Sequence, residues 1–423
     1  MDPVLITLFS VLIIGLVLSL HIGAAIGLAV LAAIWVGDLE PALFSQKLYS
    51  VFNSFPLLAL PFFVCAGDIM QRGSMAGALL KLSRTLVGHI TGGLSLVSVL
   101  TCLFYGSLCG SPPATVAAVG GIMIPAMEKE GYPKSFATAV NTASGTLGAL
   151  IPPSTALIIY GATAGVSISD LFIAIIVPGC ILGVAFMILG TAISGVRGYG
   201  IKTSRANFKE RMEALWEAKW ALMVPVLVLG GIYTGITTPT EAGVVAVVYA
   251  LFAETFITKT MTWKKLVEIF SSTVHTTGMM FFVITAATAM GTILVYFNAD
   301  TVVADMLSGV TTNKYVLIFL VCTLIIILGT FMETVALIMI MTPILLPMMV
   351  NSGMTPVHFG VVMTFGVILG NITPPVGMNL YVGCGISGIS FALLSRAIMP
   401  FIAVMIGCFY LISYVPAFST CLL

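Results

Sequence analysis

GALIPPSTALIIYG, residues 148–161, places two prolines and a serine inside a stretch that is otherwise apolar enough for a membrane. Proline removes a backbone N–H donor and breaks a helix, and a carbonyl group freed in this way is costly in lipid. A helix that is broken inside a membrane therefore indicates that the freed backbone groups have a function.

The composition assigns the chain to the integral membrane proteins. Of its 423 residues, 59% are hydrophobic and only 8% are charged, whereas soluble domains carry about 25% charged residues. Apolar runs near the roughly 20 residues that cross a bilayer recur along the chain. We therefore expect an all-α, polytopic protein embedded in the lipid bilayer. The net charge of +1 and the lack of a basic stripe in the sequence argue against a nucleic-acid partner.

Basic residues mark the segments that face the cytoplasm. Arg197–Lys219 holds six Lys or Arg, and Glu254–Glu268 holds three Lys. Residues 72–84 and 129–134 carry Lys or Arg as well. These four segments are predicted to be cytoplasmic. The apolar segment 92–127 then starts and ends in the cytoplasm, either as two full crossings or as a hairpin that dips into the membrane and returns.

The opposite pattern predicts external loops. Residues 298–313 contain two Asp and no Lys or Arg, and residues 350–358 contain no Lys or Arg. On the cytoplasmic side, Lys202–Trp216 and Met261–Phe270 have the composition of amphipathic helices that lie on the membrane surface. We thus expect a multi-pass protein whose charged connections gather on its cytoplasmic face.

The opening stretch has a counterpart in the second half of the chain. Gly148–Ser154 aligns with Gly370–Val376 at a spacing of 222 residues, and both contain a Pro-Pro pair. A break that contains glycine precedes each copy, at Gly110 and at Gly329. Because the first copy begins at the cytoplasm and the second begins outside, we predict an inverted repeat. Each half then holds a re-entrant helical hairpin followed by a helix broken at Pro-Pro.

Inverted repeats with broken helices place a solute and ion site near the middle of the membrane. For a single Pro-Pro pair, a kink or a packing role is the simpler interpretation, but two pairs in matching halves favour Na⁺ binding by freed carbonyls. Glu333 is the only carboxylate within a central break, and an acid inside the membrane indicates function. Its alternative role is a helix N-cap at the hairpin tip. The repeat predicts a secondary transporter.

Other classes of function find less support. The sequence shows no suitably spaced nucleophile–base pair, no metal-ligand motif and no nucleotide-binding motif, so we expect neither an enzyme nor a bound cofactor. An ion channel would need a continuous polar pore, whereas the sequence shows two isolated breaks of opposite orientation. A channel is kept as a distant alternative.

Four blocks of sequence resemble one transporter family. They are CGSPPATVAAVGGIMIPAMEKEGY (109–132), GTLGALIPPSTALIIYGATAGVSISDLF (145–172), TPTEAG (238–243) and GNITPPVGMNLYVGCGISG (370–388). In combination they resemble the large membrane subunit of TRAP transporters (tripartite ATP-independent periplasmic transporters), and the resemblance covers essentially the whole chain. It implies an elevator-type, Na⁺-coupled transporter of small organic anions in the bacterial cell inner membrane. It also implies two partners, a small TRAP membrane subunit and a periplasmic solute-binding protein.

The resemblance also implies site residues. The first Na⁺ site of the family, formed by a hairpin break and the unwound helix that follows, matches Gly106, Cys109, Gly148, Ile151 and Pro152, largely through carbonyl groups. The second Na⁺ site matches Gly329, Gly370, Thr373 and Val376. The anion is expected between the two hairpin tips, near Ser111, Thr115, Glu333, Asn371 and Asn379.

The first hairpin bears on the identity of the solute. Sialic-acid members of the family carry a Gly-Ser-Ala-type hairpin with an Asp a few residues on, whereas this chain has Gly110-Ser111-Pro112-Pro113. The chain therefore resembles the dicarboxylate-type branch more closely, and a C4-dicarboxylate-like carboxylate is the favoured solute. A sulfonate, sialic acid or another organic acid is the alternative.

The same landmarks divide the chain into a mobile and a fixed part. Residues 92–163 and 314–386 are expected to form the transport block, each with one hairpin and one broken helix. The scaffold is expected to comprise the N-terminal helices (1–91), helices with the cytoplasmic amphipathic segments (164–271), a connecting membrane helix with an external loop (272–313) and a C-terminal helix (387–423).

Overall fold

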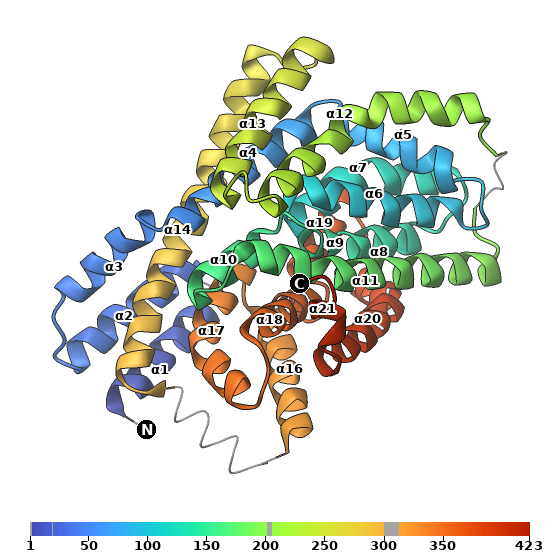
Figure 1. Cartoon of the computed structure of the whole chain (residues 1–423). Helices are drawn as coiled ribbons and strands as arrows, with labels where there is room; N and C mark the ends of the chain where they lie inside the picture. The colour runs from blue at the N-terminus through green and yellow to red at the C-terminus, as the bar shows by residue number, and fades with distance from the viewer. Residues whose placement is uncertain (1, 19, 201–204, 300–312) are drawn as a thin grey trace.

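The computed structural model describes residues 2–18, 20–200, 205–299 and 313–423, and every regular element within these ranges is helical. The prediction of an all-α protein is confirmed (Figure 1). The elements are, in chain order, α1 (Pro3–Val17), α2 (Ile22–Val36), α3 (Ala42–Phe52), η1 (Phe55–Leu58), α4 (Ala59–Arg72), α5 (Met75–Val87), α6 (Gly93–Cys109), α7 (Pro112–Lys129), α8 (Lys134–Ser144), α9 (Leu147–Leu150), α10 (Thr155–Ala164), α11 (Ile168–Arg197), α12 (Phe208–Tyr233), α13 (Pro239–Phe252), η2 (Ala253–Ile257), α14 (Trp263–Tyr296), α16 (Lys314–Phe331), α17 (Thr334–Asn351), α18 (Pro356–Gly370), α19 (Met378–Ser387), α20 (Phe391–Tyr414) and α21 (Ala417–Thr420).

Many of these helices have the dimensions of membrane spans. Seven helices in the described part of the chain are long and apolar enough to cross a membrane, and two bent pairs raise the number to nine if each pair counts as one span. One bent pair joins α3 and α4, and the other joins α8 and α9 to α10. Since about 20 residues cross the hydrocarbon core, these helices agree with the predicted multi-pass protein.

Each predicted repeat contains a helical hairpin followed by an interrupted helix. In the first repeat, α6 and α7 meet at Gly110, and the next helix stops at Leu150 and resumes at Thr155. In the second repeat, α16 and α17 form the hairpin, and the next helix stops at Gly370 and resumes at Met378. Each interruption contains a Pro-Pro pair joined by a cis peptide bond. The two predicted breaks are therefore present where the prolines place them.

The two repeats pack across one another near the middle of the molecule (Figure 1). Helix α19, which follows the second break, packs on α7 and α8, and α10, which follows the first break, packs on α17 and α18. Small residues permit this approach, as interfaces between membrane helices require. A side chain at Gly383 would collide with Thr142, and one at Gly360 would collide with Tyr160. Both breaks consequently lie in one packed unit.

The polar contacts agree with the predicted sides of the membrane. Five ion pairs occur among the described residues, and all join segments expected to be cytoplasmic: Arg72–Glu268, Lys81–Glu217, Arg84–Glu130, Lys134–Glu128 and Lys209–Glu213. Toward the other side, the Tyr160 hydroxyl donates to the Pro356 carbonyl at 2.7 Å. Pro356 belongs to the loop expected outside, so in the predicted topology the first broken helix runs from the cytoplasmic toward the external face.

A buried carboxylate connects η2 to the start of α5. Glu254 in η2 is fully buried, and it accepts hydrogen bonds from the backbone N–H groups of Ser74 (2.8 Å) and Met75 (3.0 Å). The hydroxyls of Thr258 (2.6 Å) and Thr260 also donate to it. Ser74 forms no side-chain cap of its own on α5. Glu254 therefore supplies the cap that the first turn of α5 needs.

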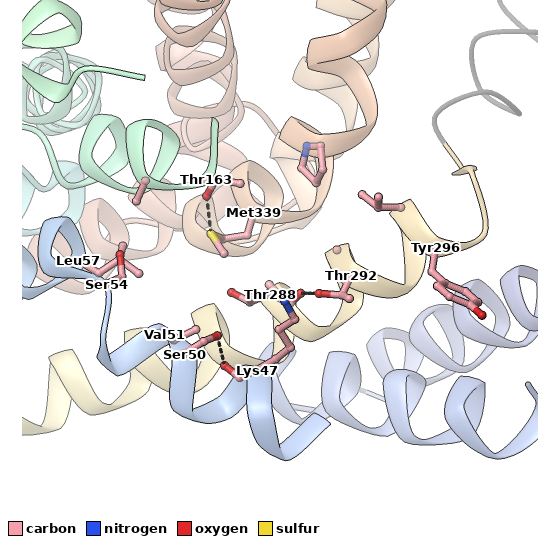
Figure 2. Close-up of a pocket in the computed structure, with 15 residues that line it drawn as sticks. Lys47, Ser50, Val51, Ser54, Leu57, Thr163, Thr288, Thr292, Tyr296 and Met339 are labelled. Atoms are coloured by element: carbon pink, nitrogen blue, oxygen red, sulfur yellow. Dashed lines mark hydrogen bonds between the residues drawn. The ribbon is translucent and has the colours of Figure 1, made fainter. Parts of the chain in front are cut away.

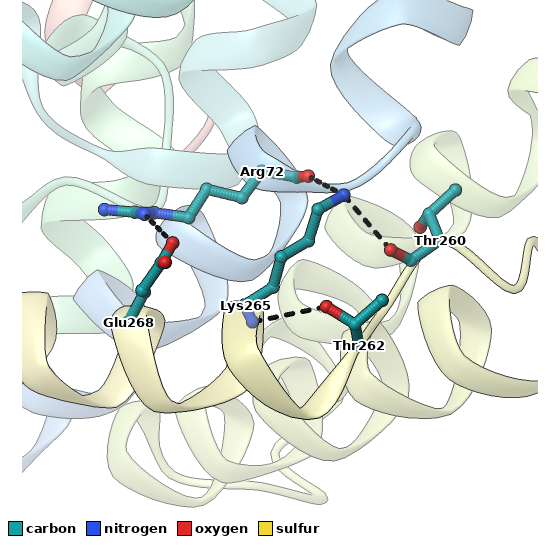
Figure 3. A network of polar contacts seen from close by, with 5 residues as sticks. All are labelled: Arg72, Thr260, Thr262, Lys265 and Glu268. Atoms are coloured by element: carbon teal, nitrogen blue, oxygen red, sulfur yellow. Dashed lines mark hydrogen bonds and ion pairs between the residues drawn. The ribbon is translucent and has the colours of Figure 1, made fainter.

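A second group of polar contacts extends this junction (Figure 3). Arg72, the last residue of α4, pairs with Glu268 of α14 at 3.3 Å. The Lys265 ammonium group donates to the Arg72 carbonyl (3.4 Å) and to the Thr260 carbonyl (3.1 Å). These contacts and those of Glu254 connect α4, α5, η2 and α14, so the connections on this face form one structural unit.

The cytoplasmic segments differ from the expectation in their helices. Phe208–Tyr233 is a single helix, so the described part of Lys202–Trp216 is the start of α12 and not a separate surface helix. Met261–Phe270 likewise leads directly into the 34-residue α14. Neither segment contains a helix breaker before the apolar stretch that follows it, so the helix continues. Residues 201–204 and 300–312 of the predicted loops lie outside the described residues.

Two long helices pack differently from the boundaries expected above. Helix α11 packs on α6, α20, α21, α18, α10 and α9, and α20 packs mainly on α8, α11 and α18. Most of these partners belong to the two repeats, whereas the sequence-based boundaries assign residues 164–197 and 391–414 to the scaffold. Which helices move together stays a prediction. Helices α2, α3, α4 and α13 pack instead around α14, or around each other.

Candidate functional site

The tip of the first hairpin rests on the first break. Gly110 has a left-handed backbone with φ of 62°, which favours glycine, and it ends α6. Its carbonyl accepts hydrogen bonds from both the backbone N–H (3.4 Å) and the hydroxyl (3.0 Å) of Thr155. An added Cβ at Gly110 would collide with the Pro153 carbonyl. The turn of the hairpin and the interrupted helix are therefore in direct backbone contact.

The five residues predicted for the first Na⁺ site lie on the two segments that meet here, residues 106–109 of α6 and residues 148–152 of the interrupted helix. An added Cβ at Gly106 would lie 2.8 Å from the Leu147 carbonyl and 3.0 Å from the Gly148 Cα, so α6 and α9 touch through their backbones. Cys109 lies one residue before the tip, and Ile151 and Pro152 form the start of the break. The structure thus brings together the backbone segments that the resemblance implies.

Two of the predicted solute residues lie at the same tip. The Thr115 hydroxyl donates to the Ser111 carbonyl (2.9 Å) and lies 3.2 Å from the Cys109 sulfur. Gly148 packs against both residues, because an added Cβ would collide with the Thr115 hydroxyl and approach the Ser111 carbonyl to 3.0 Å. Thr115 is fully buried and Ser111 is partly exposed. Ser111 therefore presents the more accessible of the two hydroxyls.

The tip of the second hairpin meets the second break in the same manner. An added Cβ at Gly370 would collide with the backbone of Gly329, so α16 and α18 touch at these two glycines. The Gly377 N–H donates to the Thr330 carbonyl at 3.3 Å. The Asn371 side-chain amide donates to the Thr334 hydroxyl at 3.1 Å. As in the first repeat, backbone and side-chain contacts join the hairpin to the interrupted helix.

The second break keeps its shape through hydrogen bonds within residues 370–379. The Thr373 N–H donates to the Gly370 carbonyl (3.0 Å), and the Asn379 N–H donates to the Asn371 carbonyl (3.0 Å). The Thr373 hydroxyl donates its proton to the Leu369 carbonyl at 2.8 Å, which leaves the oxygen lone pairs available to a cation. Val376 is 38% exposed, so its apolar side chain faces outward and only its backbone is suited to an ion.

Glu333 occupies the N-cap position of α17. Its carboxylate accepts hydrogen bonds from the backbone N–H groups of Val335 (2.9 Å) and Ala336 (3.3 Å). An acidic N-cap satisfies otherwise unpaired donors and interacts favourably with the positive end of the helix dipole. Of the two roles considered for Glu333, the geometry therefore provides the cap directly. A direct role in solute binding is not shown by these contacts.

A buried amide lies on the helix that follows the second break. Asn379 is fully buried, and neither its side-chain nitrogen nor its side-chain oxygen has a hydrogen-bond partner among the described residues. Burying an unpaired amide costs about 1–3 kcal/mol, so such a group is expected to meet a polar ligand or water. Asn379 lies on α19, the helix that packs on α7 and α8 of the first repeat.

Sequence reasoning missed several polar groups around these breaks. Asn141, Thr142 and Ser144 on α8 and Ser154 in the first break are fully buried, and each has a side-chain oxygen without a partner among the described residues. A signal was available in the run Asn141-Thr-Ala-Ser144, which places three polar residues in an otherwise buried helix. Helix α19, which carries Asn379, also packs on α8.

The arrangement suits an anion together with small hard cations. Two breaks present backbone oxygens, which are the ligands preferred by Na⁺-like ions, and buried amides and hydroxyls can hydrogen-bond a carboxylate or sulfonate. Within the described ranges, no group of three or more His, Cys, Asp or Glu is placed to hold a metal ion. The groups gathered at the two breaks are therefore suited to reversible binding by backbone and side-chain dipoles.

Comparison with known proteins adds an independent line of evidence. Residues 5–418 match the family described as tripartite ATP-independent periplasmic transporter, DctM component. A protein of Oleidesulfovibrio alaskensis named isethionate TRAP transporter permease protein DctMQ is 40% identical over 417 residues, which cover 98% of this chain and 66% of that protein. This chain thus spans slightly less than two thirds of the length of that relative.

A second relative matches along its whole length. The C4-dicarboxylate TRAP transporter large permease protein DctM of Rhodobacter capsulatus is 34% identical over 431 residues, with 98% of each chain covered. Among solved structures, the YdaH transporter of Alcanivorax borkumensis has a TM-score of 0.61 at 16% identity, over 89% of this chain and 88% of that one. At this low identity, the similarity to YdaH supports the fold alone.

Proposed function

The chain belongs to the DctM-component family of tripartite ATP-independent periplasmic transporters and is a large TRAP membrane permease subunit, not an enzyme; from this premise we propose that it imports a small organic anion with Na⁺ as the coupling ion. The observation that carries the proposal is the pair of contacts between hairpin tips and Pro-Pro breaks. Each contact gathers backbone oxygens beside buried hydroxyl or amide groups, in two repeats that the sequence predicts to have opposite orientations.

In this proposal, Na⁺ binds at both breaks. Carbonyl groups from Gly106–Cys109 and Gly148–Pro152 form the first site, and those of Gly329 and residues 370–376 form the second, with the Thr373 hydroxyl as an additional ligand. The contacts of Gly110 with Thr155 and of Gly370 with Gly329 hold the carbonyl groups close to one another. An ion bound at either break would join a hairpin to its broken helix.

The solute is proposed to bind between the tips, next to the two ions. Ser111 and Asn379 supply hydrogen-bond donors, with Thr115 and Asn371 packed beside them. We assign Glu333 the role of capping the second hairpin, because its carboxylate oxygen already accepts two backbone hydrogen bonds. Removing a cap of this kind costs about 1 kcal/mol, so Glu333 would support the tip without contacting the anion.

The relatives differ in the anions that their names specify, so the proposal concerns a class of solutes. Isethionate is a sulfonate with one negative charge, and a C4-dicarboxylate carries two. Both are small and offer oxygen acceptors to the donors described above. A C4-dicarboxylate-like carboxylate is the first solute to test, followed by isethionate and sialic acid.

Movement is proposed to follow an elevator mechanism. The two repeats together with α11 and α20 would move as one block, and α1–α5 and α12–α14 would form the scaffold beside the small subunit. The hairpins would be re-entrant, so that each tip stays near the middle of the inner membrane. The periplasmic binding protein would deliver the anion at the external face, where residues 350–358 connect α17 and α18.

Uptake by purified protein in proteoliposomes tests this function. The permease, its small subunit and the solute-loaded binding protein should give saturable uptake that requires a Na⁺ gradient. A channel would instead give uptake that does not saturate and that follows the solute gradient without Na⁺. Uptake that is independent of Na⁺ for every anion in the panel would contradict the proposal.

A further inference from the structure

A cavity of about 560 Å³ lies away from the two breaks. One wall comes from α3, the turn after it and α14, which belong to the proposed scaffold. The other comes from α10, α17 and their neighbours in the proposed block. Figure 2 shows Lys47, Ser50 and Thr288 on one side of the cavity, with Thr163 and Met339 on the other. The cavity thus lies between the two parts that are proposed to move relative to each other.

Lys47 is the only charged side chain among the described residues that line this cavity. Its side chain runs from α3 toward α14, where Thr288 and Thr292 lie (Figure 2). None of the ion pairs among the described residues includes Lys47. Because an ammonium group that is partly removed from water gains from an opposite charge, this half-buried cation is suited to an anionic ligand.

In the predicted topology, the cavity lies toward the external face. Thr163 is at the end of α10 beyond the first break, close to Tyr160, whose hydroxyl reaches the Pro356 carbonyl in the predicted external loop. Basic residues are rare on that side, because most Lys and Arg lie in the four cytoplasmic segments. Lys314 also lies there, but its ammonium group donates to the Gly353 carbonyl (3.5 Å), outside the cavity.

We propose that this cavity is an outer anion-binding site, in which Lys47 and Ser54 hold the carboxylate or sulfonate group of the solute before it reaches the hairpin tips. The Ser54 hydroxyl makes no capping hydrogen bond at the start of η1 and can donate to an anion. The hydroxyls of Thr288 and Thr292 donate to backbone carbonyls at 2.8 and 3.0 Å, so they form a polar wall rather than further donors. The assignment of the solute as the ligand rests on the proposed function.

The carbon skeleton of the anion would meet an apolar surface. Val51, Leu57, Ala287, Met339 and Pro343 line the cavity beside the polar groups. A lipid phosphate shares the relevant chemistry, since it too carries oxygen atoms with negative charge next to an apolar chain. The experiments therefore need one readout for a free organic anion and another for bound phospholipid.

This site differs from the breaks in its dependence on Na⁺. At the breaks, neutral carbonyl groups attract an anion only indirectly, through a bound cation. At the cavity, the positive charge belongs to Lys47 and is present without Na⁺. We therefore expect organic anions to bind here in a medium that contains no Na⁺.

Thermal unfolding of the purified permease with its small subunit tests the site without transport. The choline salts of succinate and isethionate are compared with choline chloride at equal ionic strength, because an anion that binds the native state raises the unfolding midpoint. The wild type, Lys47→Arg and Lys314→Gln should show the increase. Lys47→Gln should need about tenfold more anion for the same increase, as expected for loss of one charged hydrogen bond.

Two further readouts separate the alternatives. In proteoliposomes, Lys47→Gln should raise the half-saturating concentration of loaded binding protein about tenfold, and should leave the half-saturating Na⁺ concentration unchanged. Phospholipid retained per protein should be equal in the wild type and in Lys47→Gln. Loss of a bound phospholipid in Lys47→Gln would assign the cavity to lipid and overturn the proposal, as would equal stabilisation of the two proteins by the anions.

The test distinguishes failure of the site from failure of the proposed function. If uptake is coupled to Na⁺ but Lys47→Gln behaves as the wild type does, the function stands and the outer site is wrong. If no uptake depends on Na⁺ but the stabilisation by anions requires Lys47, the site stands and the coupling is wrong. If the wild type shows no stabilisation by either anion in choline medium, the outer site is refuted.

Discussion

Gly370→Ala changes the contact on which the proposed second Na⁺ site depends. The added methyl group would lie 2.6 Å from the Gly329 Cα and closer still to the carbonyl carbon and oxygen of Gly329, whereas ordinary contact begins at 3.4 Å. Because all three atoms belong to backbone, no side-chain rotation relieves the collision, and α16 and α18 must separate by about 1 Å. Overpacking of this kind costs about 1–3 kcal/mol.

A separation of about 1 Å also exceeds the tolerance of roughly 0.5 Å within which the ligating groups of a binding site must keep their positions. We expect the half-saturating Na⁺ concentration to rise at least about tenfold, which corresponds to about 1.4 kcal/mol. Uptake into proteoliposomes is measured as a function of external Na⁺ at a saturating concentration of loaded binding protein, and the unfolding midpoint is recorded for each variant.

Gly385→Ala is the matched control. Gly385 lies on α19 in the same packed unit, and an added Cβ there meets no atom within 4 Å. The half-saturating Na⁺ concentration for uptake by Gly385→Ala should equal that of the wild type. If Gly370→Ala folds and also keeps the Na⁺ dependence of the wild type, the contact between Gly329 and Gly370 is not part of an ion site, and the assignment is refuted.

Three further predictions concern ligands, scaffold and partners. Thr373→Val keeps the shape of the side chain but removes its oxygen, so the half-saturating Na⁺ concentration for uptake should rise several-fold. The affinity of the separate binding protein for the solute should stay constant. An unchanged Na⁺ dependence of uptake would exclude the Thr373 hydroxyl as a ligand. Glu254→Ala leaves the buried N–H donors of α5 without an acceptor and should destabilise the protein by about 2–4 kcal/mol. The control variant Glu217→Gln should cost less than about 1 kcal/mol, because the pair of Glu217 with Lys81 is half exposed. Equal unfolding midpoints for these two variants would contradict the role of Glu254. Free solute without the binding protein should be taken up poorly, and equal rates with and without that protein would refute the proposed dependence.

The breaks could be predicted from the sequence because they depend on local chemistry, and the same holds for the clustering of charged segments. Proline cannot continue a helix, so the Pro-Pro pairs at residues 152 and 374 set the interruptions regardless of the surroundings. Lys and Arg are retained on the cytoplasmic side, and all five ion pairs connect such segments. The capping box of Thr238 and Glu241 at the start of α13 is local in the same sense.

The grouping of helices could not be predicted because it depends on shape between distant segments. Nothing within residues 168–197 indicates that α11 packs on the repeats and not on α12–α14. The cavity at Lys47 likewise requires four helices from separate parts of the chain. Glu333 shows the limit of sequence reasoning at a single residue, since a capping and a binding carboxylate have the same local sequence.

Charge movement tests the coupling of two Na⁺ ions to one anion most directly. Moving one elementary charge is worth about 2.3 kcal/mol per 100 mV, so two Na⁺ carried with a monoanion should make uptake faster when the vesicle interior is negative. With two ion sites, uptake of a dianion should not respond to the potential. The measurement is initial uptake of isethionate and of succinate into proteoliposomes at fixed Na⁺ gradient, with the potential set by K⁺ and valinomycin. The account predicts acceleration for isethionate alone; uptake of isethionate that is slowed by an interior-negative potential would contradict it.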